Sequence, residues 1–230
     1  MRKVVSDQAD GLRHLMANSP GQMLAVVGGG PAVGVTSVTL NLAAALVQQG
    51  KDVLLLDEHR AAPAPTAAQR QGRLLLIDAR LDAQGALSPL AAQADNVLVV
   101  LQPNAPSIKA SYACIKGLHY AHALPRVRVL VNFATDAAQA QHILANLAHA
   151  SGRYLALALE SAGWVRADPR LAQARRLNLT VVEAFQTSPA ALDFRQIASD
   201  LPHWPWRRQA CAEPATAVPG APARPVLELH

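Results

Sequence analysis

Short apolar runs, rich in valine and leucine, recur along the chain between stretches with helical periodicity, and this alternation restricts the fold more than any other feature. Five runs are regular and two are less so: Leu24 to Val27, Val53 to Leu56, Leu74 to Ile77, Val97 to Leu101 and Val127 to Val131, then Tyr154 to Leu159 and Thr180 to Ala184. Strands that are apolar on both faces and separated by helices belong to a parallel sheet that helices cover on both sides. We therefore expect an α/β domain built on a mostly parallel sheet.

The two ends of the chain differ in composition from this body. Residues 1–20 form a polar leader whose apolar residues have helical spacing, namely Ala9, Leu12, Leu15 and Met16. Residues 209–230 place four prolines among alanines, a composition with too little apolar surface to offset the entropy of ordering. The sequence predicts a leader at 1–20, one domain at 21–203, and a disordered tail at 204–230.

Charge and cysteine content narrow the classes of function. The net charge of +5 is spread thinly and forms no basic block, which argues against a dedicated nucleic-acid binder. The two cysteines, Cys114 and Cys211, lie far apart, which favours a reducing compartment and predicts a cytoplasmic protein. Trp204-Pro205-Trp206-Arg207-Arg208 suits weak, peripheral contact with a membrane surface, although we favour packing of both tryptophans on the domain.

A glycine-rich loop follows the first predicted strand. Gly29, four residues, and then Gly34-Val35-Thr36 match the spacing of a phosphate-binding loop, with a helix predicted from Ser37 to Gln48. Val35 stands where the lysine of such a loop would reach the β and γ phosphates. An ordinary strand-to-helix turn is the simpler interpretation of the spacing alone.

A flavin or nicotinamide site is a second alternative for the same loop. The segment from Val26 to Ala32, VVGGGPA, looks like the opening of a flavoprotein dinucleotide site. Val33 replaces the third glycine of that motif, and Asp57 comes 29 positions after Gly28 rather than the usual ~20. We keep FAD or NAD(P) binding by an oxidoreductase as a minority hypothesis.

The rest of the chain favours another family. Gly29 to Ala43, GGPAVGVTSVTLNLA, resembles the deviant phosphate loop of the MinD/ParA ATPases, G-K-G-G-V-G-K-T followed by an Asn-Leu-Ala helix. Leu54-Leu55-Leu56-Asp57 is similar to the second strand and acid of that family, and Leu76-Ile77-Asp78 to its Walker B strand. Val131-Asn132 is similar to the strand end whose asparagine faces the adenine.

Two further segments resemble the regulators of flagellar number (FlhG/FleN type) within this family. Asp7-Gln8-Ala9-Asp10-Gly11-Leu12-Arg13 is similar to their D-Q-A-x-x-L-R leader, and the segment from Pro103 to Lys116 to P-E-P-T-S-I-x-D-A-Y-x-x-x-K. The resemblance implies that the leader binds the flagellar GTPase of the signal-recognition-particle type (FlhF-like) and stimulates its hydrolysis. The residues implied in that contact are Asp7, Gln8, Leu12, Arg13, Leu15 and Met16.

The chain departs from the family pattern at several positions where family members have charged residues. Gly30 and Val35 replace both loop lysines, Pro31 removes a backbone N–H, and His59 replaces the second acid. Charge-assisted hydrogen bonds contribute ~1.5–3 kcal/mol each, so two losses weaken triphosphate binding by roughly two to four orders of magnitude. We therefore expect weak or lost ATP hydrolysis and no ATP-driven homodimer, with a slow ATPase as the alternative.

The resemblance also assigns a vestigial nucleotide site. Its phosphate and base contacts would come from Gly29, Gly30, Gly34, Val35, Thr36, Ser37 and Asn132. Thr36 and Asp78 would hold Mg²⁺ only if a Mg²⁺–ATP or Mg²⁺–ADP complex binds, and Asp57 and Asp78 are the catalytic remnants. Structural roles compete with these: Thr36 could cap its helix, the two aspartates could accept from loop amides, and Asn132 could be a turn residue.

Finally, the interval between the second strand and the Walker B strand is short. Only 20 residues separate Asp57 from Asp78, whereas the family carries additional helices and a strand there. A parallel crossover needs a dozen or more residues. The sequence therefore predicts a P-loop NTPase-like sheet with a shortened second crossover.

Overall fold

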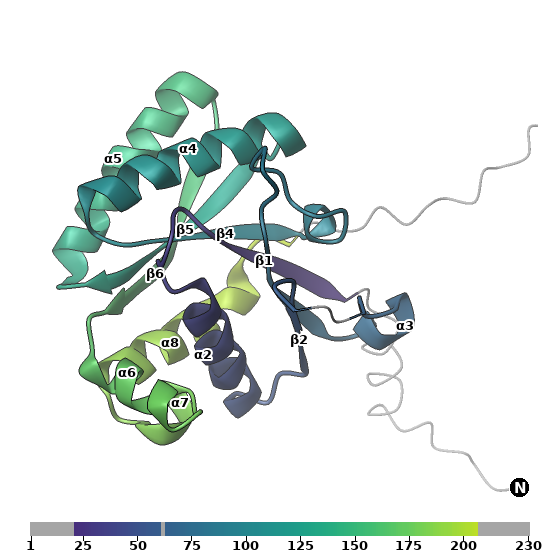
Figure 1. Ribbon diagram of the computed structural model, residues 1–230, viewed down its shortest axis with the longest axis vertical. Helices are drawn as coiled ribbons and strands as arrows, with labels where there is room; N and C mark the ends of the chain where they lie inside the picture. The colour runs from purple at the N-terminus through teal and green to yellow at the C-terminus, as the bar shows by residue number, and fades with distance from the viewer. Residues whose placement is uncertain (1–20, 61–62, 207–230) are drawn as a thin grey trace, which may run out of the picture.

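The computed structural model describes residues 21–60 and 63–206, so the predicted leader and nearly all of the predicted tail lie outside the described residues. The strands are β1 (Gln22–Gly28), β2 (Val53–Asp57), β3 (Leu74–Asp78), β4 (Asn96–Leu101), β5 (Arg126–Ala134) and β6 (Ala158–Arg166). The α-helices are α2 (Val35–Gln48), α3 (Ala67–Arg70), α4 (Ala105–His122), α5 (Ala137–Leu155), α6 (Pro169–Arg176), α7 (Val181–Ala184) and α8 (Pro189–Asp200), with short 3₁₀ turns at Ala91–Gln93 (η1) and Leu201–His203 (η2) (Figure 1).

The strands form one six-stranded sheet in the order β2-β3-β1-β4-β5-β6, and each pair of neighbours is parallel. All five regular apolar runs of the sequence coincide with strands, because β3 and β4 are buried at every position and β1 at its five central positions. The predicted α/β fold with a parallel sheet is confirmed.

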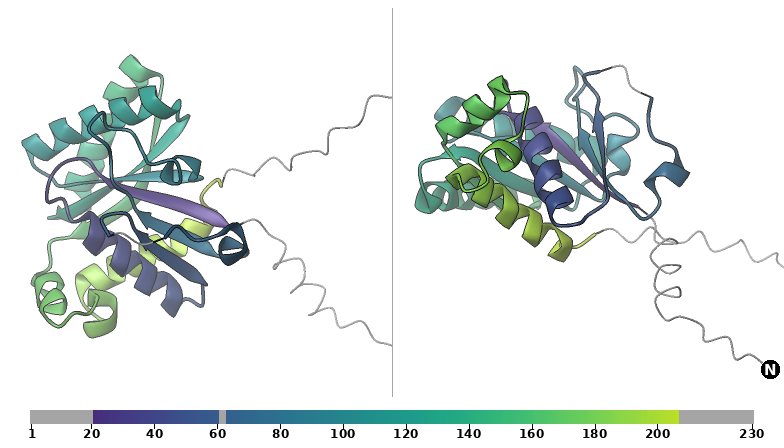
Figure 2. Two further views of the ribbon diagram at one scale, coloured as in Figure 1. Left: turned by 45° about the vertical axis from the view of Figure 1, so that its right-hand side comes forward. Right: turned by 90° about the horizontal axis from the view of Figure 1, so that it is seen from below.

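Helices cover both faces of this sheet (Figure 2). On one face α2, α6, α7 and α8 pack over a core that includes Leu42 and Phe194, and on the other η1, α4 and α5 pack over a core that includes Ile115 and Leu147. The carboxyl ends of all six strands therefore point to one edge of the sheet, where open α/β folds place their ligands.

Two of the sequence predictions were wrong. Thr180 to Ala184 is not a strand, because Thr180 and Glu183 form a capping box that starts the helical turn α7. Tyr154 lies in α5, which ends only when Ala156 adopts a left-handed conformation (φ 51°), and the last strand then runs from Ala158 to Arg166. The predicted run ended at Leu159, near the start of this strand, because Glu160 and the small residues after it interrupt the apolar pattern.

The crossover from β2 to β3 is as short as predicted. Among the described residues of this crossover, the only helix is the single turn α3, which Thr66 and Gln69 cap and which contains no buried residue. Since β2 is also the edge strand, one end of the sheet lacks a packed helix from this crossover.

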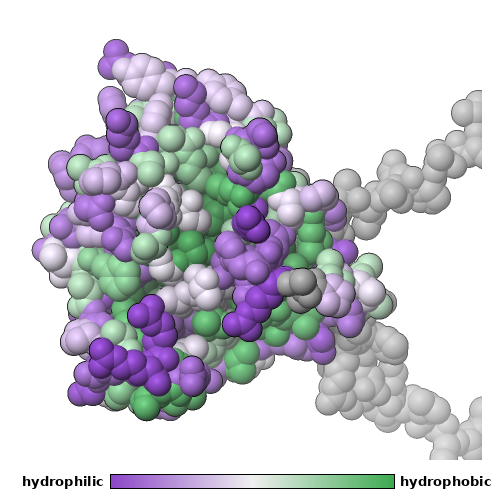
Figure 3. Space-filling view, viewed as in Figure 1, coloured by the Kyte–Doolittle hydropathy of each residue, from purple (hydrophilic) through white to green (hydrophobic). Residues whose placement is uncertain are grey.

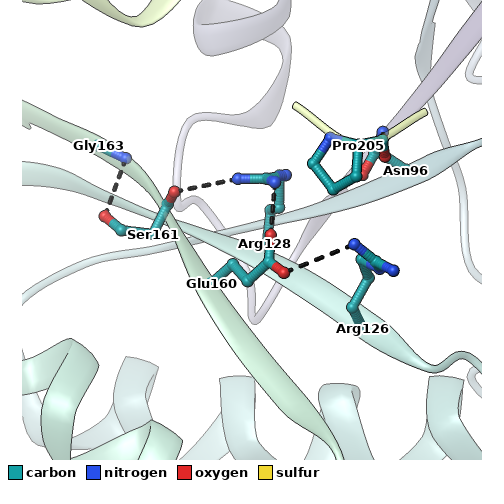
Figure 4. Close-up of polar contacts among 7 residues, drawn as sticks. All are labelled: Asn96, Arg126, Arg128, Glu160, Ser161, Gly163 and Pro205. Atoms are coloured by element: carbon teal, nitrogen blue, oxygen red, sulfur yellow. Dashed lines mark hydrogen bonds and ion pairs between the residues drawn. The ribbon is translucent and has the colours of Figure 1, made fainter. Parts of the chain in front are cut away.

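The described chain ends in a segment that packs back on the domain, as predicted for its two tryptophans. Trp204 is buried in the core beneath α8, and Trp206 packs against the same cluster. The guanidinium of Arg128, buried on β5, lies 4.2 Å from the Trp204 ring and pairs with Glu160 on β6. Asn96 Nδ2 donates to the Pro205 carbonyl at 3.3 Å, so the amino ends of β4, β5 and β6 hold this segment (Figure 4).

No helix among the described residues is long and apolar enough to span a bilayer.

Candidate functional site

The loop between β1 and α2 lies at the carboxyl edge of the sheet, beside a cavity of about 1340 Å³. The cavity extends from this loop along the exposed side of α2 to β2 and to the segment between α6 and α7. Its lining includes all the predicted nucleotide-binding residues except Gly29 and Asn132. Gly29 is a buried residue of the loop itself, and Asn132 is a buried residue of β5.

Three hydrogen bonds fix the loop to the ends of the neighbouring strands. The Gly29 N–H donates to the Val100 carbonyl of β4 at 2.8 Å. The side chain of Gln102, just after β4, donates to the Ala32 carbonyl at 2.9 Å. Asn132 Nδ2, near the end of β5, donates to the Val33 carbonyl at 2.9 Å, so the loop is held in one conformation from the side of the sheet.

Asn132 therefore has a structural partner for each end of its amide, since its Oδ1 also accepts from the Phe133 N–H at 3.1 Å. The side chain is buried, and it acts here as a brace for the loop. The sequence suggested either an adenine contact or a turn residue. Neither interpretation anticipated the bond to Val33, because the two residues lie 99 positions apart.

Close packing explains two of the loop glycines. A Cβ on Gly29 would lie 2.0 Å from Ser111 Oγ on α4, and a Cβ on Gly34 would lie 2.7 Å from Asn132 Nδ2. Gly34 also has φ 90°, which favours glycine. Ala32 adopts φ 55°, a left-handed conformation that costs a residue with a side chain about 1–2 kcal/mol.

Val35 and Thr36 begin α2, and no side chain caps this helix. Its N-cap residue is Gly34, so the prediction that Thr36 serves as the cap was wrong. Val35 is half-buried, and its Cγ2 would lie 3.0 Å from a Cβ on Gly28, which places a methyl group close to the end of β1. Ser37 uses its backbone carbonyl to accept from Asn41 Nδ2 at 2.7 Å.

Asp57 and Asp78 end β2 and β3 at paired positions of the sheet. Asp57 Oδ1 accepts from the His59 N–H at 2.9 Å, and its Oδ2 lies 3.3 Å from Arg60 Nε. The structural role predicted for Asp57, acceptance from a loop amide, is thus confirmed. The same role is wrong for Asp78, because neither of its carboxylate oxygens has a hydrogen-bond partner.

Asp78 is 2% exposed, and burial raises the pKa of its carboxyl group. The Thr36 hydroxyl, which lies beside the carboxylate short of hydrogen-bond geometry, and His59 oppose this shift only in part. His59 Nε2 lies 3.6 Å from Asp78 Oδ1. His59 therefore presents its imidazole to the carboxylate of Asp78.

The donor atoms at Thr36 and Asp78 fit a Mg²⁺ ion that arrives with a nucleotide. A hydroxyl and an unpartnered carboxylate are the oxygen ligands that Mg²⁺ takes in sites of this kind. The described residues contain no cluster of three or more His, Cys, Asp or Glu that would bind a metal by itself. Any Mg²⁺ held here would need phosphate oxygens to complete its coordination.

Glu58 ties down the segment that follows Asp78. Its carboxylate accepts from the Arg80 N–H at 3.0 Å and from the Ser88 hydroxyl at 2.5 Å, and the Glu58 N–H donates to the Asp78 carbonyl at 3.1 Å. The sequence analysis did not single out Glu58. These bonds hold the two chain segments beyond β2 and β3 together without a ligand.

Comparison with known proteins gives one curated relative and a set of similar structures. No family model matches the chain. The antiactivator FleN of Pseudomonas aeruginosa is 26% identical over 84% of this chain and 91% of its own. The MinD cell division protein of Aquifex aeolicus is 18% identical and covers 81% of this chain and 100% of its own with a TM-score of 0.60.

Two other similar structures carry nucleotides. MinD of Pyrococcus horikoshii, complexed with Mg-ADP, is 13% identical over 78% of this chain and 95% of its own, with a TM-score of 0.55. A complex of a Cyanothece McdA variant with ATP is 12% identical over 80% of this chain and 97% of its own, with a TM-score of 0.51. At identities this low, the structural similarity establishes a shared fold and nothing more.

Proposed function

Because the chain belongs to the MinD/ParA family of P-loop ATPases, we propose that it regulates flagellar number or placement as an adaptor that binds partners and hydrolyses ATP weakly or not at all. Its similarity to FleN supports the flagellar role. The proposed partner is the flagellar GTPase of the signal-recognition-particle type. We place the adaptor in the cytoplasm, with weak peripheral contact at the inner membrane or cell pole.

One observation carries the proposed loss of hydrolysis: the loop has a fixed turn with the spacing of a phosphate loop, but neither of the motif's lysines. Ala32 and Gly34 are left-handed, and Gly30 and Val35 occupy the positions of the lysines in the motif that the chain resembles. In phosphoryl transfer the protein acts mainly by positioning and by stabilising negative charge. A loop with the right shape and no charge supplies only the first of these.

The remaining residues would treat a nucleotide as a weak ligand. The N–H groups at the start of α2 would contact the phosphates, and Thr36 and Asp78 would hold the accompanying Mg²⁺ ion, which would neutralise part of the phosphate charge. Asp57 is engaged with His59 and Arg60 rather than free to orient water. These contacts favour binding without turnover.

Turnover is the direct test of this proposal. Purified protein with Mg²⁺ and ATP should release little phosphate above background and should remain the same size on addition of ATP. An intact MinD-type ATPase, assayed alongside, shows that the conditions support hydrolysis. Turnover comparable to that enzyme, abolished by Asp57→Ala, would refute the proposal.

A slow but genuine ATPase is the second candidate, and the unpartnered oxygens of Asp78 beside Thr36 favour it. Single-turnover measurement at high protein concentration separates the two, because a slow enzyme converts a bound stoichiometric amount of ATP with time. The flavin or nicotinamide alternative is set aside, since the relatives named above are P-loop proteins.

Partner binding is assigned to the leader, whose D-Q-A-x-x-L-R sequence is intact. Leu12, Leu15 and Met16 would form the apolar face of a helix in a groove of the GTPase, while Gln8 and Arg13 would act on its water and phosphates. Gln8→Ala should therefore reduce GTPase stimulation more than binding, and Leu12→Asp should reduce both. Unchanged stimulation after deletion of residues 1–17 would exclude the leader as the partner site.

A further inference from the structure

An apolar stripe on α2 remains exposed beside the edge strand β2. Leu40, Ala44 and Val47 recur at helical spacing and line the large cavity, as does Leu55 of β2. The exposed fractions are 42% for Leu40, 57% for Val47 and 44% for Leu55. Figure 3 shows hydrophobic patches over the region where Figure 1 places α2 and β2.

Val53 packs toward the core beneath α2, so Leu55, two residues on, belongs to the same face of the sheet. The connections that run from β3 toward β6, with η1, α4 and α5, lie on the opposite face, as right-handed crossovers do. Among the described helices, α2 is therefore the outermost on this face, at the end of the sheet where β2 is the edge strand.

We propose that the leader of the same chain, residues 5–17, docks as a helix in this groove alongside α2. Val5, Ala9, Leu12 and Met16 recur at intervals of three and four residues and would face the stripe on α2. The structure supports this occupant through the place where the described chain begins and through the length of the segment before it.

The chain enters the domain at the correct end of the groove. Gln22 pairs with Leu74 of β3, and Leu74 pairs with Val53 of β2, so two strand spacings, about 10 Å, separate Gln22 from Val53. The four residues from Asn18 to Gly21 span up to about 13 Å when extended. They suffice to carry the chain from β1 to the level of Val53.

The length of the leader also fits the groove. Residues 7–17 would form a helix about 16 Å long, and β2 from Val53 to Asp57 is about 13 Å long. A helix that starts near Val53 therefore brings Asp7 to the level of Asp57. There Arg80 is exposed and forms no ion pair with a residue that the structure describes, so it is open to the Asp7 carboxylate.

Docking would hide the leader from its partner. Leu12 and Met16 cannot contact α2 and a GTPase at the same time, so the docked form is self-inhibited. The docking itself rests on the geometry above. Only this consequence rests on the proposed function.

Hydrogen exchange on the full-length chain, without any partner, tests the docking. The amides of residues 8–17 should be protected in the natural sequence and in a Leu192→Asp control, whose position on α8 is 52% exposed and outside the cavity. Val47→Asp and Leu40→Asp should each abolish that protection while leaving β1 and β4 protected.

Two results would overturn the inference. One is a leader that exchanges at the unprotected rate in the natural sequence, or equally in all four proteins. The other is protection that disappears on dilution together with a dimer seen by light scattering, which would make the groove an interface between copies.

Affinity for the GTPase separates this inference from the proposed function. If protection is about tenfold, about a tenth of the leader is undocked, and Val47→Asp should tighten GTPase binding about tenfold. Protection without any GTPase binding would refute the proposed function alone. GTPase binding by an unprotected leader would refute the docking alone.

Discussion

Replacing Asp78 by asparagine should stabilise the protein at neutral pH. The Asp78 side chain is 2% exposed, and both of its oxygens lack hydrogen-bond partners. Its one ion-pair contact with a described residue is His59 Nε2 at 3.6 Å, and the His59 side chain is half exposed. Such a carboxylate is costly to ionise in the folded state, and asparagine removes that cost while keeping the shape of the side chain.

The sign of the pH dependence follows from the direction of the pKa shift. Because burial raises the pKa of Asp78, the folded protein holds this proton more tightly than the unfolded chain. The contribution of Asp78 to the free energy of unfolding is therefore complete below the ordinary carboxyl pKa, ~3.9, and is lost as the pH rises through the raised value. Asparagine does not ionise, so the variant avoids this loss.

The expected gain follows from the charge, since a buried group without partners costs more when it is ionised than when it is neutral. Taking that difference as about 1–3 kcal/mol, with each kcal/mol shifting Tm by about 2–4 °C in a protein of this size, we expect Asp78→Asn to raise Tm by roughly 2–12 °C at pH 7.5, and by little at pH 4. Thermal unfolding followed by circular dichroism at the two pH values measures both.

Asp57→Asn is the matched control, because Asp57 ends the neighbouring strand at the paired position and has partners for its carboxylate. Its Tm should change by no more than an ordinary surface substitution, about 0.5 kcal/mol. A lower Tm for Asp78→Asn at pH 7.5, or an equal gain at both pH values, would show that the Asp78 charge does not destabilise the folded protein.

Three other variants test the loop and the end of the domain. Val35→Lys alone should not restore Mg²⁺-dependent phosphate release, because Pro31 still lacks its N–H and position 30 its lysine; rescue would show that the loop is otherwise complete. Asn132→Ala should lower the free energy of unfolding by about 1–3 kcal/mol in a urea titration, since it leaves the Val33 carbonyl without its donor, and an unchanged midpoint would argue against the brace. Trp204→Ala should cost about 3–5 kcal/mol in the same titration, because it removes a buried aromatic ring from above Arg128, and a loss under 1 kcal/mol would contradict its core role.

Much of the fold could be predicted from the sequence because burial on both faces leaves a direct pattern. The runs Leu74 to Ile77 and Val97 to Leu101 contain no polar residue, and both are central strands. The run at Thr180 to Ala184 contains two adjacent valines, but Thr180 and Glu183 are spaced for a capping box, and this local signal decides the structure. Strand β6 was harder to delimit, because it lies at the edge of the sheet and includes Glu160 and Gly163.

The site was predictable in position but not in its contacts. The spacing of Gly29 and Gly34 located the loop, and the ends of two apolar runs located Asp57 and Asp78. The bond from Asn132 to Val33 and the approach of His59 to Asp78 depend on how separate crossovers meet at one edge of the sheet. The pattern of apolar residues within one segment cannot predict such contacts between segments that are far apart in the sequence.

The shape of the loop between β1 and α2 and the charge of a phosphate-binding loop depend on different residues. The conformation is fixed from outside the loop by Gln102 and Asn132 and from within by Gly34, and none of these needs a lysine. Val35, at the position of the lysine in the resembled motif, packs against the core beneath α2. The conformation of the loop therefore does not depend on a positive charge at this position.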